Sequence, residues 1–185
     1  TADNGVYVFN GFIGSDRYWN KINNGLSDLN IRSLAAVDSF TVMAGTTSGL
    51  FMTSNSGANW TAINDADING EEITSIVKAG ARYFLATADG GVFVSDDNGA
   101  SWSDYNDVNT LGIAGTSKLS YNSATQELMV LNDNGLFIAT NVLAAGAAVY
   151  TAVAAILPSV ESRYIDNNGT GWVLATNDGV YTSSA

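Results

Sequence analysis

The chain has 185 residues, of which 46% are hydrophobic and only 14% are charged, which is typical of a single folded domain with a substantial core, here expected over residues 1–185. Acidic residues number 18 and basic residues 7, and the resulting net charge of −11 argues against a nucleic-acid partner, since a phosphate backbone needs a basic face. The absence of Cys and His excludes disulfides, thiolate or imidazole metal ligands, and His-based catalysis.

A short pattern of Gly, an aliphatic residue and an aromatic residue recurs five times along the chain. The repeated glycines are Gly5, Gly49, Gly91, Gly135 and Gly179, at successive spacings of 44, 42, 44 and 44 residues. Turn residues such as Asp133-Asn134 precede most of them, and Asn-Gly or Asp-Gly pairs supply the positive φ of tight hairpins. Each glycine is therefore predicted to open the second strand of a hairpin.

Further strands are predicted around each glycine from runs of β-branched, aromatic and aliphatic residues. The preceding hairpin partners are expected at 40–45, 83–87, 127–131 and 172–176. A strand marked by an aromatic residue follows the first four glycines, at Trp19, Trp60, Trp102 and Tyr150. Connectors then lead to strands at 31–37, 73–79, 117–121 and 160–165. Four short antiparallel strands in each 42- to 44-residue repeat are typical of a β-propeller blade.

The predicted fold is therefore all-β, a β-propeller with about four four-stranded blades. The chain begins with the last two strands of one blade and ends with the first three of another, so the strand after the repeat glycine is present at both ends. If the two ends complete one shared blade, one copy of this strand is displaced to an edge. Alternatively, the chain is a segment of a larger propeller, or the ends complete blades of neighbouring copies by strand addition.

One segment carries a family motif. Residues 95–102 read Ser-Asp-Asp-Asn-Gly-Ala-Ser-Trp and match the Asp-box pattern Ser-x-Asp-x-Gly-x-(Thr/Ser)-Trp, and residues 53–60 are a softened copy. The chain thus resembles the Asp-box (BNR-repeat) propellers, which include sialidases, xyloglucan-active glycoside hydrolases, sortilin-type receptors, photosystem assembly factors and sensor ectodomains.

The resemblance implies structural roles for the box residues, which are Ser95, Asp97, Gly99 and Trp102 in one box and Asn55, Gly57 and Trp60 in the other. The Asp or Asn side chain is expected to accept hydrogen bonds from its own turn, and the Gly to permit that turn. The Trp residues, together with Trp19, are expected to pack between sheets.

The densest cluster of oxygen ligands lies at 65–72, where Asp65, Asp67, Asn69 and Glu71 follow the spacing of the first half of a calcium loop. The twelfth position of such a loop would be Ile76 rather than Glu, and no helices are expected beside it. Two interpretations stay open here, a Ca²⁺ site or a solvated acidic loop with an Asn-Gly turn.

Catalytic chemistry has few candidates, and no catalytic residue is assigned. The arginines Arg17, Arg32, Arg82 and Arg163 are not expected to converge, which argues against a sialidase site. Asp38, Glu161 and Asp166 lie near the predicted inner strands and can supply a pair of glycosidase carboxylates, or else be solvated. Tyr18, Tyr105 and Tyr164 can stack on sugars or pack between blades.

The leading hypothesis is a non-enzymatic extracellular or cell-surface module for interaction and assembly, which self-associates into an oligomer or filament. Few Lys, no Cys and many Asn, Ser, Thr and Gly favour that compartment, and no apolar run reaches the roughly 20 residues of a membrane helix. The expected partners are copies of the chain or another protein. No cofactor is expected, and Ca²⁺ is the one candidate ion. One alternative is a glycan-binding or glycoside-hydrolase propeller, and another is a protein-binding sensor or assembly factor.

Overall fold

The computed structural model describes residues 4–13, 16–106, 115–144, 149–153, 162–167 and 171–183, which are built from β-strands. The strands form five antiparallel sheets. The first sheet is an N-terminal hairpin of β1 (Tyr7–Ile13) and β2 (Asp16–Lys21), and the other four sheets are numbered as blades 1 to 4.

Blade 1 consists of β3 (Ile31–Ala36), β4 (Val42–Thr46), β5 (Gly49–Thr53) and β6 (Thr61–Ile63), and blade 2 of β7 (Ile73–Ala79), β8 (Arg82–Thr87), β9 (Gly91–Ser95) and β10 (Ser103–Asp104). Blade 3 consists of β11 (Thr116–Asn122), β12 (Glu127–Asn132), β13 (Gly135–Ala139) and β14 (Tyr150–Ala152), and blade 4 of β15 (Ser162–Asn167), β16 (Trp172–Thr176) and β17 (Gly179–Thr182).

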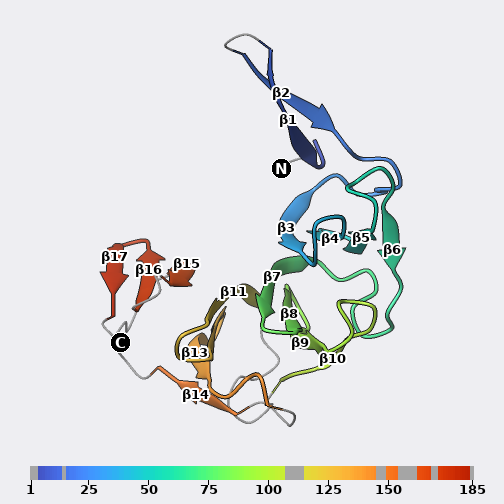
Figure 1. The fold of residues 1–185 in the computed structure, drawn as a ribbon. Coiled ribbons are helices and arrows are strands. Elements are labelled where there is room, and N and C mark those ends of the chain that lie inside the picture. Colours follow the sequence, from blue (N-terminus) through green and yellow to red (C-terminus); the bar gives the residue numbers. More distant parts are fainter. Residues whose placement is uncertain are drawn as a thin grey trace.

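The sheets follow one another along an open arc (Figure 1). The first strands of the four blades, β3, β7, β11 and β15, contact one another in turn and form the inner rim. The hairpin projects from one end of the arc, and blade 4 lies at the other end. The two ends do not share a sheet, so the strands described here do not close a ring.

The strand pattern confirms the predicted all-β, propeller-like fold. Each repeat glycine after the first opens a strand whose hairpin partner directly precedes it. The φ angles of 130° at Gly135 and 139° at Gly179 lie where a side chain would be strained, which explains why the repeat uses glycine there. The duplicated strand is observed at both ends, as β1 and as β17.

Buried apolar side chains fill the seam between each pair of successive blades. Examples are Met43, Leu50, Ile76 and Leu85 between blades 1 and 2, Phe84, Val92, Leu119 and Val130 between blades 2 and 3, and Met129, Leu131, Ile165 and Leu174 between blades 3 and 4. The hydrophobic effect that stabilises the arc therefore acts mainly between blades, so a blade depends on its neighbours.

Polar contacts also cross the seams. The Ser33 hydroxyl accepts a hydrogen bond from the Ile76 backbone N–H at 2.9 Å, and the Ser75 hydroxyl accepts one from the Leu119 N–H at 3.2 Å. Ser33 and Ser75 occupy the same place in successive first strands, so blades 1 and 2 each use this hydroxyl to fix the next blade.

A buried arginine joins blades 2 and 3. Arg82 donates to both carboxylate oxygens of Asp96, at 2.6 and 3.2 Å, and to the backbone carbonyls of Val142 and Ala144, at 2.7 and 2.9 Å. Its guanidinium also lies 5.6 Å from the ring centroid of Tyr105. Every observed partner of this cation is structural.

No helix long and apolar enough to span a membrane occurs in the part of the chain that the structure describes.

Candidate functional site

The turn at residues 95–102 is a closed hydrogen-bonded unit. The Asp97 carboxylate accepts hydrogen bonds from the hydroxyl of Ser95 at 2.8 Å, from the N–H of Ala100 at 3.0 Å, and from the N–H of Ser101 at 2.9 Å and its hydroxyl at 2.5 Å. The Ser95 hydroxyl in turn accepts from the Gly99 N–H at 2.8 Å. Desolvation alone would raise the pKa of Asp97, but the hydrogen bonds from Ser101 and its neighbours lower it overall.

The softened copy at residues 53–60 uses the same geometry without a charge. The Asn55 side-chain oxygen accepts from the Thr53 hydroxyl and from the Asn59 N–H, both at 2.9 Å. The Thr53 hydroxyl accepts from the Gly57 N–H at 2.9 Å. A Cβ atom at Gly57 would come within 2.3 Å of the Ile22 side chain, so this glycine also permits close packing. In both turns the observed partners of the Asp or Asn side chain belong to the turn itself.

The tryptophans behave differently from one another. Trp60 and Trp102 are each only 4% exposed and lie in the seam clusters. The prediction that Trp19 is a core residue is wrong, since its side chain is 56% exposed. Trp19 lies on the two-stranded hairpin, where the described residues include no first and second strand to cover it.

The acidic loop at 65–72 serves the neighbouring turn. The Asp65 carboxylate accepts from the Asp67 N–H at 3.0 Å and, through its second oxygen, from the Trp102 N–H at 3.0 Å. Ile68 in the same loop is fully buried. Over the described residues no group of three or more His, Cys, Asp or Glu side chains is placed to hold a metal ion. The interpretation of Asp65, Asp67, Asn69 and Glu71 as Ca²⁺ ligands stays a prediction.

The candidate catalytic carboxylates are not brought together either. Asp38 lies in the turn between β3 and β4, and hydrogen bonds from the backbone of Phe40 and from Thr41 lower its pKa. Asp166 lies in β15, in a blade three further along the arc, and accepts from the Ser120 hydroxyl at 3.0 Å. Glu161 lies outside the described residues.

The arginines named as candidates lie in different parts of the fold, and one of the candidate tyrosines is buried. Arg32 pairs with Glu72 at 2.9 Å, and Arg82 is buried in its interblade site. Arg17 belongs to the hairpin strand β2, and the side chain of Arg163 lies outside the described part. Tyr105 is 6% exposed and packs between blades, which removes it as a sugar platform.

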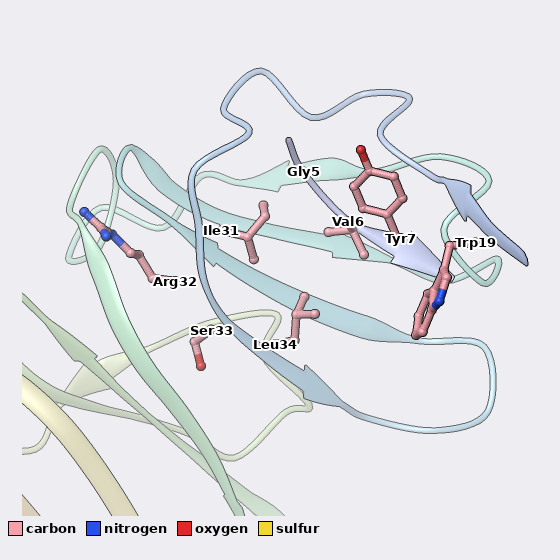
Figure 2. Close-up of a pocket in the computed structure, with 8 residues that line it drawn as sticks. All are labelled: Gly5, Val6, Tyr7, Trp19, Ile31, Arg32, Ser33 and Leu34. Carbon is pink, nitrogen blue, oxygen red and sulfur yellow. The ribbon is translucent and has the colours of Figure 1, made fainter. Parts of the chain in front are cut away.

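A groove of about 400 Å³ lies between the N-terminal hairpin and β3 (Figure 2). Gly5, Val6, Tyr7 and Trp19 of the hairpin and Ile31, Arg32, Ser33 and Leu34 of blade 1 line it. Its walls are mostly apolar, and Trp19, Leu34 and Tyr7 are 56%, 51% and 39% exposed. Such a surface gains free energy when another apolar segment covers it.

Comparison of the blades explains this exposure. Leu34 lies opposite Ala44 in its sheet, and the same place is taken by Ile76, Leu119 and Ile165 in the other blades. These three side chains are 6%, 1% and 0% exposed, against 51% for Leu34. In those blades the inner strands of the preceding blade lie against this position, whereas blade 1 is preceded by a hairpin of two strands only. The groove therefore lies where the first and second strands of a preceding blade would pack, and the described residues include no such pair.

The other end of the arc shows the complementary feature. Val180 directly follows its repeat glycine and is 69% exposed, whereas Val6, Leu50 and Val92 at the same place are 7%, 1% and 0% exposed and Leu136 is partly buried. Its strand β17 is the last strand of its sheet, where complete blades carry a fourth. Sequence reasoning found the unequal strand count at the two ends but not this pair of surfaces, because exposure depends on which strands lie alongside.

No protein-family model and no curated protein matches the sequence. Among solved structures, the chain is similar to PorZ, a surface component of the type-IX secretion system of Porphyromonas gingivalis, with a TM-score of 0.68, 19% identity, and 99% of this chain and 25% of that chain covered. The chain is also similar to a GH74 xyloglucanase of Xanthomonas campestris, with a TM-score of 0.67 and 15% identity. The match covers 100% of this chain and 34% of that chain. A third similar structure is the extracellular domain of the putative one-component system BT4673 of B. thetaiotaomicron, with a TM-score of 0.72 and 15% identity. The match covers 99% of this chain and 24% of that chain.

These likenesses show the propeller-like fold and nothing finer, because the identities lie between 15% and 19%. The chain spans only about a quarter to a third of each of these structures.

Proposed function

We propose that residues 1–185 form a single Asp-box-type propeller domain that acts as a non-enzymatic interaction module and self-associates through its incomplete terminal blades. The observation that carries the proposal is the pair of exposed apolar surfaces at opposite ends of the arc. Leu34 on one surface is 51% exposed and Val180 on the other is 69% exposed, although the same places in the complete blades are buried or, at Leu136, partly buried.

Two physical effects favour association at these ends. Each half-exposed large apolar side chain gains roughly 1 to 2 kcal/mol when it leaves water. The strand β17 also lies at the edge of its sheet among the described residues, and a strand in that position can be exchanged for an equivalent strand of another copy. Since the two surfaces differ, association is head-to-tail and yields a ring if it closes or a filament if it does not.

The absence of a gathered site in the described residues supports a non-enzymatic role. Asp97, Asn55 and Arg82 are occupied by structural hydrogen bonds, and Asp38 and Asp166 lie in different blades. An extracellular or cell-surface location is supported by the composition and by similarity to a surface component and to an extracellular domain.

The mass of the purified chain in solution tests this proposal. Light scattering over a range of concentrations is expected to give multiples of the single-chain mass, and electron microscopy is expected to show rings or filaments. A single-chain mass at every concentration, up to the solubility limit, would overturn self-association.

A glycan-binding role is the second candidate, and it is favoured by aromatic side chains on the N-terminal hairpin. Tyr7, Tyr18 and Trp19 are 39%, 50% and 56% exposed, and exposed aromatic rings form platforms for sugars. The fold is also similar to that of a xyloglucanase. Glycan-array binding that is lost in a Trp19→Ala variant would support this role, whereas a blank array would remove it.

A further inference from the structure

We infer that the groove between the N-terminal hairpin and β3 receives β15 and β16 of a second copy, so that one complete blade is built from two chains. This inference rests on the proposed self-association and specifies its surfaces. In the composite blade, β15 and β16 of one copy are followed by β1 and β2 of the next. The strand β17 is released from β16, and β1 takes over its pairing with β16.

The strand β1 has the residues needed to replace β17. The segments Gly5-Val6-Tyr7 and Gly179-Val180-Tyr181 are identical. Within blade 4, Val180 lies opposite Ala175 and Tyr181 opposite Leu174. A β1 strand in the same register would place Val6 opposite Ala175 and Tyr7 opposite Leu174, which keeps each side chain on its original face of the sheet.

The hairpin is already anchored as the outer half of a blade. The Asn23 side-chain oxygen accepts from the Val6 N–H at 2.7 Å, and in blade 2 the Asn106 oxygen accepts from the Val92 N–H at 2.8 Å. Val6 is 7% exposed and packs in the cluster that joins the hairpin to blade 1. The hairpin thus holds the places of the third and fourth strands and lacks only the first and second.

The faces that would meet are those that meet inside the arc. The hydroxyls of Ser33 and Ser75 reach the first strand of the next blade, at Ile76 and Leu119. In blade 4 the corresponding place, after the bulge in the first strand, is Tyr164, which is 47% exposed. Leu34 is the counterpart of Ile76 and Leu119 in blade 1. Tyr164 of one copy is therefore expected to lie against Leu34 of the next, and both would be covered.

The charge of the chain sets a second expectation. Each copy carries a net charge of −11, so two copies repel each other at long range. Because the groove is apolar and salt screens the repulsion, association is expected to strengthen as NaCl concentration rises. An interface dominated by ion pairs would weaken instead.

Cysteine cross-linking tests the inference directly, because the chain has no native Cys. Leu34→Cys and Tyr164→Cys are prepared as separate single variants, and their melting temperatures are compared with that of the wild type. The two are then mixed and mildly oxidised. A disulfide forms readily only where Cβ atoms approach to about 4 Å. The expected result is a disulfide-linked dimer in the mixture well above its level in either variant alone.

A matched control uses Phe40→Cys mixed with Leu34→Cys. Phe40 is 64% exposed and lies in the turn between β3 and β4, outside the lining of the groove. This mixture is expected to give only the background level of cross-linking. Leu34→Asp, with Phe40→Asp as its partner control, adds a readout without a thiol: the first is expected to weaken association at least about tenfold and the second to leave it within about twofold.

The outcomes separate the two proposals. Oligomers in light scattering without cross-linking above the control would overturn the composite blade and leave self-association standing. A single-chain mass together with no cross-linking would overturn both. A fall in association with rising NaCl would also contradict the apolar groove as the contact surface.

Discussion

Replacement of Asp28 by Asn tests how the connector between the N-terminal hairpin and blade 1 is held. The Asp28 carboxylate accepts from the Thr47 hydroxyl at 2.6 Å and from the Asn30 N–H at 2.9 Å. Thr47 lies in the turn between β4 and β5, so these bonds fix the path of the chain into β3. Partial burial alone would raise the pKa of Asp28, but the hydrogen bonds, led by that from Thr47, lower it from 3.8 to about 2.

The size of the effect follows from this shift. A pKa that is lower in the folded state means that folding favours the ionised carboxylate, so the stabilisation is present above pH 3.8 and is lost as pH falls towards about 2. At about 1.4 kcal/mol per pKa unit, Asp28 contributes about 2 kcal/mol to the free energy of unfolding at neutral pH. Asn keeps one oxygen acceptor but carries no charge, so Asp28→Asn should lose most of this contribution.

The assay is urea unfolding of both proteins between pH 7 and pH 2. The free energy of unfolding of Asp28→Asn is expected to lie up to about 2 kcal/mol below that of the wild type at neutral pH, with the difference shrinking below pH 4. Other carboxylates titrate in both proteins and cancel in the difference. A difference that stays constant down to pH 2 would refute the assignment of the stabilisation to the ionised carboxylate.

Three further sets of substitutions test the structural roles of polar groups. Arg82→Met should lower the free energy of unfolding by about 3 kcal/mol in urea unfolding, since the buried Val142 carbonyl and the partly buried Ala144 carbonyl lose their donor. Asp96→Ala, at an exposed carboxylate, should cost about 1 kcal/mol; equal losses would contradict the interblade role. Asp97→Ala should cost about 1 kcal/mol and Asp97→Asn less, since Asn55 serves the sister turn; loss of ligand binding without loss of stability would contradict a purely structural turn. Asp65→Ala should lower the melting temperature in calorimetry, and added Ca²⁺ should leave that of the wild type unchanged; a rise with Ca²⁺ would restore the calcium interpretation.

The repeat could be predicted from sequence because its signal is local. Strands such as Gly135–Ala139 follow turn residues that few other conformations accept, and apolar residues line both faces of a strand buried between blades. The hydrogen-bonded turn around Asp97 was predictable for the same reason, because its partners lie within four residues. Whether residues 1–185 form one complete domain stays a prediction.

The contacts that cross seams were not predictable. Nothing near Arg82 in the sequence indicates that its partners are carbonyls at Val142 and Ala144, in the next blade. The acidic residue Asp65 resembles a calcium ligand locally, but one of its oxygens is taken by a backbone N–H more than thirty residues further on. Trp19 has the same repeat position as Trp60, yet its exposure is set by strands that the described hairpin lacks.

The most direct test of the account compares the solution mass of the wild type with that of Leu34→Asp by light scattering at matched concentration and salt. Leu34 is half exposed in the single chain, so the substitution should leave folding and melting temperature almost unchanged. We expect multiples of the single-chain mass for the wild type and the single-chain mass for Leu34→Asp. Equal masses for the two proteins would contradict the claim that the ends of the arc mate through this groove.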